Sequence, residues 1–353
     1  RSSNYELYGD ISNRLMLILK ESCEELEIYS IDEAFAILTR PKNKNLSQWA
    51  KELRTIVYQR IGIPISIGIG DTKVQSKIAN HIAKRIEKNS GIFDIGIIEN
   101  KDDYLTHIKV DQIWGVGRKM SAWLKKRGIM NARELRDMSS EEIKNKFGII
   151  GLRLQHELKG TICIPVKATS SDRKEICVSR SFAYPIDSLE ELSQSITQYV
   201  LIACSKLRRY NQLSSSITLF INTNIYSSDY FRSEATTKLD FPSDDPRVIL
   251  QISLELTKKI FKPYHRLIKA GIILHRLQSN KYQQKQLFYT QDLREIESQE
   301  RLNKIIDNIN HKYGRDTLNW SSSVIKKDWC PSRSRISNLK TTSLESIPTI
   351  FAR

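Results

Sequence analysis

The sequence contains little cysteine, and neither its cysteines nor its histidines are spaced to bind a metal. The five cysteines are an odd number, and no two of them form a Cys-x-x-Cys pair. The six histidines are scattered, with no His-x-x-x-His or Glu-x-x-His pair to form a metal-binding helix face. These absences argue against a disulfide framework and a zinc site, and they fit a reducing, intracellular setting.

Long hydrophobic runs are also missing. The longest apolar stretches, around residues 61–69 and 92–98, are interrupted by glycine and fall far below the roughly 20 residues that cross a bilayer. No charged segment followed by an apolar one opens the chain, so we expect neither a membrane span nor a secretory precursor. The chain opens with Arg1 rather than methionine, and we expect its true start to lie further upstream.

Acidic side chains are outnumbered by basic ones. The 353 residues include 56 Lys plus Arg and 40 Asp plus Glu, for a formal net charge of +16. Clustered cations attract phosphates, so this balance favours a polyanionic partner, most often nucleic acid. A basic but otherwise ordinary soluble protein is the alternative. The length predicts two or three domains.

Helical and strand patterns alternate in the first hundred residues. The expected helices span residues 4–26, 46–60 and 71–86, and the expected strands are two short ones within 27–38 and a third at 63–70. This alternation predicts an α/β or α+β unit up to about Thr106.

The rest of the chain divides into a helical part, a polar connection and a mixed part. Helical patterns occupy residues 107–163, and the charged stretch 166–175 reads as an exposed linker. The elements expected next are strand 176–182, helix 189–209, strands 215–221 and 236–241, helix 246–261 and strand 268–277. This βαββαβ order predicts a four-stranded sheet with two helices on one face. A polar tail follows, with one helix near 293–313.

Two adjacent carboxylates, Asp32 and Glu33, interrupt the apolar hairpin within residues 27–38. Charged groups at such a place are costly to bury unless they are paired or bound to metal. At a bend, both carboxylates can converge on divalent ions, as in phosphoryl or nucleotidyl transfer with two Mg²⁺ ions. A third carboxylate would be expected, and no other acidic residue nearby has a comparable strand-end setting. A solvated turn is the alternative.

The junction from Gly68 to Lys73 joins a strand to a helix, where a helix N-terminus and a lysine can meet a phosphate group. It lacks the spacing of a Walker A loop. Lys73 and Lys77 share one helix face and are suited to contact a triphosphate or a DNA backbone. A solvated lysine face is the alternative.

A second glycine turn lies between two predicted helices. Residues 113–117 read Ile-Trp-Gly-Val-Gly and are followed by Arg118 and Lys119. In a helix-hairpin-helix, Gly115 and Gly117 would let backbone N–H groups approach a phosphate while the cations add sequence-independent attraction. A tight structural turn with a buried tryptophan is the alternative.

Further candidate binding residues lie toward the C-terminus. Several cations fall on or near the strands of the βαββαβ unit, so that one sheet face could follow a phosphate backbone. In the tail, residues 284–288 form a short apolar anchor suited to a partner's groove. The cations are Arg180, Arg232, Lys238, Arg266 and Lys269, and the anchor residues are Gln284, Leu287 and Phe288.

Several motifs together resemble one enzyme family. Residues 29–35 (YSIDEAF) resemble the palm motif of Y-family translesion DNA polymerases, and residues 3–8 and 10–16 resemble its UmuC type, that of the catalytic subunit of DNA polymerase V. The similarity continues in order at residues 68–70, 72–73 and 77–80 (second palm motif), 114–117 (thumb hairpin), 178–182 (start of the little finger), and 314–318 and 329 onward (C-terminal region). It covers essentially the whole chain.

The resemblance implies an α+β, multi-domain polymerase right hand. The palm would span residues 1–106, the thumb 107–165, a linker 166–175, the little finger 176–278 and a UmuC-type tail 279–353. The implied activity is error-prone, template-directed addition of dNTPs across damaged bases, in DNA repair and the SOS response.

The resemblance also implies roles and partners. Asp32 would be a metal ligand, Glu33 a second carboxylate near the metals and the primer end, and Lys73 a triphosphate contact. Residues 284–288 would bind the sliding clamp. The implied partners are primer–template DNA, dNTPs, Mg²⁺, a UmuD-like protein and a RecA filament, in the bacterial cytosol and near the nucleoid.

One departure from the family pattern affects the expected activity. The family begins with a strand carrying the first metal-binding aspartate and an aromatic steric gate, followed by fingers, and all of these precede the point matching Arg1. We therefore expect the 353-residue chain alone to be a poor or inactive polymerase and the full gene product to be active. The alternatives are a catalytically dead DNA-binding remnant and a clamp- or filament-binding adaptor.

Overall fold

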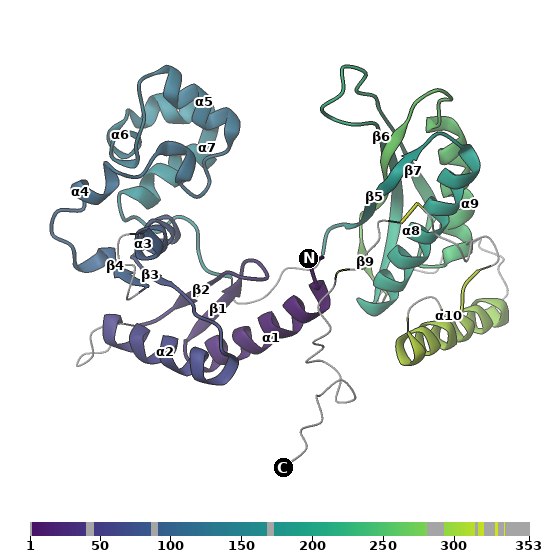
Figure 1. Ribbon diagram of the computed structural model, residues 1–353, viewed down its shortest axis with the longest axis horizontal. Coiled ribbons are helices and arrows are strands. Elements are labelled where there is room, and N and C mark those ends of the chain that lie inside the picture. The colour runs from purple at the N-terminus through teal and green to yellow at the C-terminus, as the bar shows by residue number, and fades with distance from the viewer. Residues whose placement is uncertain are drawn as a thin grey trace, which may run out of the picture. The chain divides into compact units, whose positions relative to one another are not determined.

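The computed structural model divides the chain into two compact units (Figure 1). One unit comprises Arg1–Ser170 with Arg335–Arg353, and the other comprises Ser171–Ser334. The structure describes residues 2–39, 46–85, 91–167, 173–280, 293–314, 317–320, 329–330 and 335, with the side chains of 293–297 excepted. Both units mix helices with sheet, which confirms the α+β class.

The first unit begins with alternating helices and short strands. Strands β1 and β2 form an antiparallel hairpin in which Ile28 pairs with Ala34, and strands β3 and β4 pair in parallel. The elements are α1 (Tyr5–Glu21), β1 (Glu25–Ile28), β2 (Ala34–Ile37), α2 (Leu46–Ile61), β3 (Ile67–Ile69), α3 (Lys73–Arg85) and β4 (Ile92–Asp94). The acidic hairpin and all three expected helices are confirmed. Strand β3 is shorter than expected, and β4 was not predicted.

Helix α3 packs closely against strand β3 because the strand carries glycine. A Cβ atom at Gly68 would collide with the backbone of Asn80, and one at Gly70 would lie 2.8 Å from the backbone nitrogen of Ser76. Larger residues would push α3 away from the strand. The close approach fixes the lysines of α3 relative to the sheet.

The described residues that follow β4 in the first unit are mainly helical, as predicted for residues 107–163. Its elements are η1 (Ile95–Ile97), α4 (Asp102–Leu105), η2 (Val110–Gln112), α5 (Arg118–Lys126), α6 (Ala132–Asp137) and α7 (Ser140–Leu158). Buried Ile78 and Ile82 of α3 share one core with Leu124, Leu135 and Ile143 of these helices. Because this core is continuous, α3 and the helical part hold each other in place.

The second unit contains the predicted βαββαβ arrangement. Its elements are β5 (Ile176–Ile186), α8 (Leu189–Arg209), β6 (Gln212–Asn222), β7 (Arg232–Ser243), α9 (Pro246–Ile260), β8 (Leu267–His275) and the short β9 (Gln278–Ser279). The strand order is β5-β8-β6-β7, with β9 added beside β6. Helices α8 and α9 cover one face (Figure 1), because alternate strand residues such as Ile217 and Leu219 bury their side chains there. The opposite face, here called the open face, carries no helix among the described elements.

The C-terminal helix α10 (Leu293–Tyr313) also belongs to this unit, and its predicted position is confirmed. Asp307 accepts two hydrogen bonds from the Arg208 guanidinium of α8, at 2.6 and 2.8 Å. Further along, Trp329 is 3% exposed and packs edge-on against Phe182 and Tyr199. Part of the segment expected to be a polar tail therefore completes the core of the second unit.

None of the helices in the described ranges combines the length and the apolar character that a membrane crossing requires.

Candidate active site and nucleic-acid interface

Asp32 and Glu33 lie in the carboxylate turn, residues 29–33, which connects β1 to β2. The backbone N–H groups of Tyr29 and Ser30 both donate to the carbonyl oxygen of Glu33, each at 3.0 Å. The Ser30 hydroxyl donates to the Asp32 carboxylate. Asp32 is exposed and Glu33 is partly exposed. The turn thus presents two neighbouring carboxylates toward solvent, in the place the sequence predicted.

Lys77 of α3 contacts this turn directly. Its Nζ lies 2.6 Å from Oε2 of Glu33. The same ammonium group lies 5.2 Å from the ring centre of Tyr29 and 5.5 Å from that of Phe35. Lys77 is therefore a partly exposed cation, 17% accessible, at the edge of the carboxylate turn.

Lys73 lies one helical turn earlier and in a different environment. Its side chain is only 6% exposed, and its Nζ lies 2.6 Å from Oε2 of Glu27 in β1 and 4.9 Å from the ring centre of Phe35. Glu27 also accepts the backbone N–H of Lys167, at 2.6 Å. Burial alone would raise the pKa of Glu27, but the hydrogen bonds from Lys73 and Lys167 leave that pKa below its ordinary value. Lys73 is thus held in an internal ion pair, whereas the sequence had suggested a phosphate contact.

The donor atoms of the carboxylate turn fit a hard divalent cation. Carboxylate oxygens are the preferred protein ligands of Mg²⁺. Within the described residues Asp32 forms no ion pair with a lysine or arginine, so its outer oxygen is available. No cluster of three or more His, Cys, Asp or Glu residues was found where the structure is described. The turn accordingly provides two ligands.

The glycine turn, residues 114–117, connects η2 to α5. Gly115 has a φ of +95°, and a Cβ atom there would lie 3.1 Å from Cδ1 of Leu154. Gly117 precedes the first helical residue without a side-chain cap, and a Cβ atom there would meet nothing within 4 Å. Arg118 and Lys119 are exposed beside it. The first N–H groups of α5 are consequently accessible to an anion, as the helix-hairpin-helix prediction requires.

An aromatic cluster connects the two turns, and sequence reasoning did not anticipate it. The indole N–H of Trp114 donates to the phenol oxygen of Tyr29 at 3.1 Å, although 85 residues separate them. Phe35 completes the cluster, with ring centres 5.7 Å from Tyr29 and 5.6 Å from Trp114. No local pattern could have indicated this contact, because it joins side chains from distant elements.

The open face of the second unit carries most of the cations predicted for it. Arg232 of β7 and Lys269 of β8 both pair with Asn222 of the central strand β6. Lys238 of β7 pairs with Ser216 of β6. Arg180 lies two residues after buried Val178 and four after buried Ile176, and alternate residues of a strand share a face. Arg180 is therefore on the covered face of the sheet, and the prediction that it shares the open face with the other cations is wrong. Arg266 is exposed just before β8.

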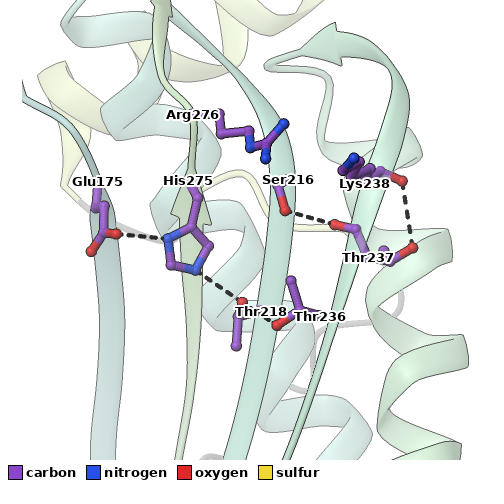
Figure 2. Close-up of a pocket in the computed structure, with 8 residues that line it drawn as sticks. All are labelled: Glu175, Ser216, Thr218, Thr236, Thr237, Lys238, His275 and Arg276. Carbon is purple, nitrogen blue, oxygen red and sulfur yellow. Dashed lines mark hydrogen bonds and ion pairs between the residues drawn. The ribbon is translucent and has the colours of Figure 1, made fainter.

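A pocket of about 620 Å³ lies on the same unit (Figure 2). His275 contacts Glu175 through Nδ1 at 2.8 Å and the Thr218 hydroxyl through Nε2 at 2.9 Å. Thr218 and Thr236 share a 2.7 Å hydrogen bond. The lining residues are Glu175, Ser216, Thr218, Thr236, Thr237, Lys238, His275 and Arg276. Hydroxyl groups beside cations suit a phosphate oxygen, and of these residues sequence reasoning had selected only Lys238.

The predicted clamp-binding residues, Gln284, Leu287 and Phe288, lie outside the described residues.

Comparison with known proteins matches three segments of the chain. Residues 1–81 match the impB/mucB/samB family, and residues 173–287 match the impB/mucB/samB family C-terminal domain. Residues 300–350 match a domain of unknown function, DUF4113. The first two segments contain the carboxylate turn and the open face.

Two relatives and a solved structure agree with these matches. The chain is 34% identical to protein UmuC of Salmonella typhimurium, over 97% of the chain and 81% of the relative. It is 30% identical to protein SamB of Salmonella typhimurium, over 98% of the chain and 82% of the relative. A Y-family DNA polymerase chimera of Dbh and Dpo4 superposes with a TM-score of 0.61 at 19% identity, covering 78% of each chain.

Proposed function

The chain belongs to the UmuC, ImpB, MucB and SamB family of Y-family DNA polymerases, which are DNA-directed DNA polymerases, and on this premise we propose how its residues serve synthesis across damaged template bases. The observation that carries the proposal is the carboxylate turn, where exposed Asp32 stands next to Glu33 and Lys77 reaches Glu33 at 2.6 Å. Two carboxylates beside a cation form a site suited to a nucleoside triphosphate with its metal.

Asp32 and Glu33 would hold the divalent cation on which Y-family polymerases generally depend, and we propose Mg²⁺. When bound, Mg²⁺ supplies Lewis-acid stabilisation of the charge that develops on the transferred phosphate. Asp32 is suited to direct ligation because its carboxylate contacts only the Ser30 hydroxyl among the described residues. Glu33, ion-paired with Lys77, is suited to the second position, near the primer end.

We assign the triphosphate contact to Lys77 in place of Lys73, the residue that the family resemblance implies. Lys77 is partly exposed and touches the carboxylate turn, so its ammonium group can move from Glu33 to a phosphate oxygen. Lys73 would first have to break its ion pair with Glu27. The Glu27 side chain is only 18% exposed, so its carboxylate would be left without a counter-charge at a largely covered position. The positions of the two lysines thus favour Lys77 as the residue that binds substrate and Lys73 as the one that holds β1 against α3.

The DNA backbone would be held at two surfaces. At the glycine turn, N–H groups beyond Gly117 and the cations Arg118 and Lys119 suit a phosphate. On the open face, Lys238 and Lys269 provide charge without base recognition. Such contacts fit a polymerase that must hold templates of any sequence.

Membership in this family also supports the finer proposals. We propose that synthesis is error-prone, that it serves the SOS response in the bacterial cytosol, and that a UmuD-like protein and a RecA filament assist it. Residues 284–288 (QKQLF) would bind the sliding clamp, because a short apolar anchor in a polar segment suits a hydrophobic groove.

Primer extension past an abasic site tests the function, using protein expressed from its complete reading frame. We expect Asp32→Asn to lower the extension rate at least about a hundredfold, since it removes a ligand charge from the transition state. The matched control is Asp103→Asn, at an exposed aspartate of α4. If the unaltered protein binds DNA but extends no primer, it is instead a DNA-binding protein that has lost its catalytic activity.

A further inference from the structure

The carboxylate turn and the glycine turn meet through the side chains of Tyr29 and Trp114. We propose that these two residues are positioning residues, which transmit the binding of a DNA backbone at the glycine turn to the geometry of Asp32 and Glu33. The inference rests on the proposed function, since it assigns DNA to one turn and substrate to the other. Neither ring is assigned a contact with the reacting atoms.

On the substrate side, Tyr29 is built into the carboxylate turn. Its backbone N–H donates to the Glu33 carbonyl oxygen at 3.0 Å, which closes the turn around Asp32. Its ring also lies under the Lys77 ammonium group, 5.2 Å from the ring centre, while Lys77 pairs with Glu33. A displacement of the Tyr29 ring therefore changes both the shape of the turn and the cation beside it.

On the DNA side, Trp114 is the first residue of the glycine turn. Gly115 follows it with a φ of +95°, and the Val116 N–H donates to the Ile113 carbonyl oxygen at 3.0 Å. This backbone geometry leaves Trp114 little freedom to move independently of Gly117, where α5 begins. A phosphate that binds at the start of α5 thus acts on a turn whose first side chain already touches Tyr29.

The contact between the two rings is directional. The Trp114 indole N–H reaches the Tyr29 oxygen at 3.1 Å, and the ring planes meet at 73° with centres 5.8 Å apart. Phe35, only 8% exposed, supports both rings from β2. Tyr29 itself is 48% exposed. Because water can replace a hydrogen bond at such a site at small cost, its main effect is on position and not on stability.

The test measures how strongly bound DNA increases the affinity for the correct dNTP. The variants are Tyr29→Phe, which removes only the hydroxyl group, Trp114→Phe, which replaces the indole by a smaller ring without the N–H, and the double variant. The matched control is Tyr104→Phe, whose ring packs against Phe93 in the same unit. Protein from the complete reading frame is used, with dNTP affinity measured by titration with and without primer–template DNA.

We expect each single variant to reduce the DNA-induced gain in dNTP affinity by about two- to tenfold, the effect of one neutral hydrogen bond. The double variant should lose no more than either single one, since all three break the same bond. In Tyr29→Phe, the affinity for DNA alone and the unfolding midpoint should match those of the control. A merely structural role would move the midpoint and leave the gain intact.

Two other outcomes overturn the inference in distinguishable ways. An unchanged gain in Tyr29→Phe, or losses that add in the double variant, would overturn the coupling and leave the proposed function standing. Failure of the unaltered protein to bind primer–template DNA would overturn the proposed function together with this inference.

Discussion

Lys73 and Lys77 show how two residues of one type, four positions apart, come to differ in role. Both lie on the side of α3 that faces the β1–β2 hairpin, as their spacing predicts. Lys73 faces Glu27 in the strand, and Lys77 faces Glu33 in the turn. The Lys73 side chain is 6% exposed and that of Lys77 is 17% exposed. We therefore propose that the first lysine stabilises the fold and that the second is left for a ligand.

The ion pair of Glu27 with Lys73 predicts a specific pH dependence of stability. Because the pKa of Glu27 is lowered in the folded protein from an ordinary value of 4.5, its contribution is complete above that value and is lost as the pH falls through the lowered pKa. We expect Glu27→Gln to cost about 1–3 kcal/mol of unfolding free energy at pH 7, with the difference from the unaltered protein shrinking toward pH 3.

Urea unfolding between pH 3 and 7 makes this measurement. Glu25→Gln, at an exposed position of the same strand, is the control and should change stability little at any pH. A Glu27→Gln deficit that stayed constant with pH would contradict the ion pair as its source.

At the scale of elements, the two glycines of the glycine turn have different roles. Gly115 is required by its backbone, because φ is +95° and Leu154 lies against the position of a Cβ atom. Gly117 has an ordinary φ of −84° and open space around it. Because no atom of the protein lies near the position of a Cβ atom, the missing side chain mainly leaves room for a ligand, which we propose is DNA.

Alanine substitution at Gly115 and at Gly117 distinguishes these two roles. We expect Gly115→Ala to destabilise the protein by about 1–2 kcal/mol, the cost of a left-handed conformation for a residue with a Cβ atom. Gly117→Ala should cost only about 0.5–1 kcal/mol, because alanine is a poorer N-cap than glycine, and yet weaken DNA binding several-fold, because the added methyl group meets the phosphate. Thermal unfolding and DNA titration of both variants check this, and equal DNA affinity in Gly117→Ala would remove the turn from the interface.

The elements themselves could be predicted from sequence to a large degree. Apolar periodicity located the helices now described as α1, α2, α3, α8, α9 and α10 and the strands of the βαββαβ unit. Strand β4 was missed because three residues carry too little pattern to recognise. Arg180 was placed on the wrong face, although it alternates with the apolar Ile176 and Val178 of β5, and the pairing of Arg180 with buried Ala270 shows that this side is covered.

For the whole molecule, the formal net charge of +16 predicts DNA binding that weakens steeply with salt. Each phosphate contact contributes roughly −0.9 to the slope of log K against log salt concentration. We expect Lys238→Ala, on the open face, to reduce the magnitude of the slope by about 1. Lys258→Ala, on helix α9 of the opposite layer, is the control and should leave it unchanged.

Titrations of one duplex over about 50–200 mM salt provide the slopes. Equal losses in the two variants would mean that the overall charge, and not the open face, holds the DNA.

What the sequence determined by itself was local: the type and order of the elements, the excess of cations, the acidic pair at a hairpin tip and the glycine turn after Trp114. These follow from periodicity and backbone preference, which act over a few residues. The tertiary structure decided which lysine faces the carboxylate turn, that Trp114 touches Tyr29, and that Trp329 enters the core of the second unit. Such contacts join residues far apart in the chain, and only the packing of whole elements against one another selects them.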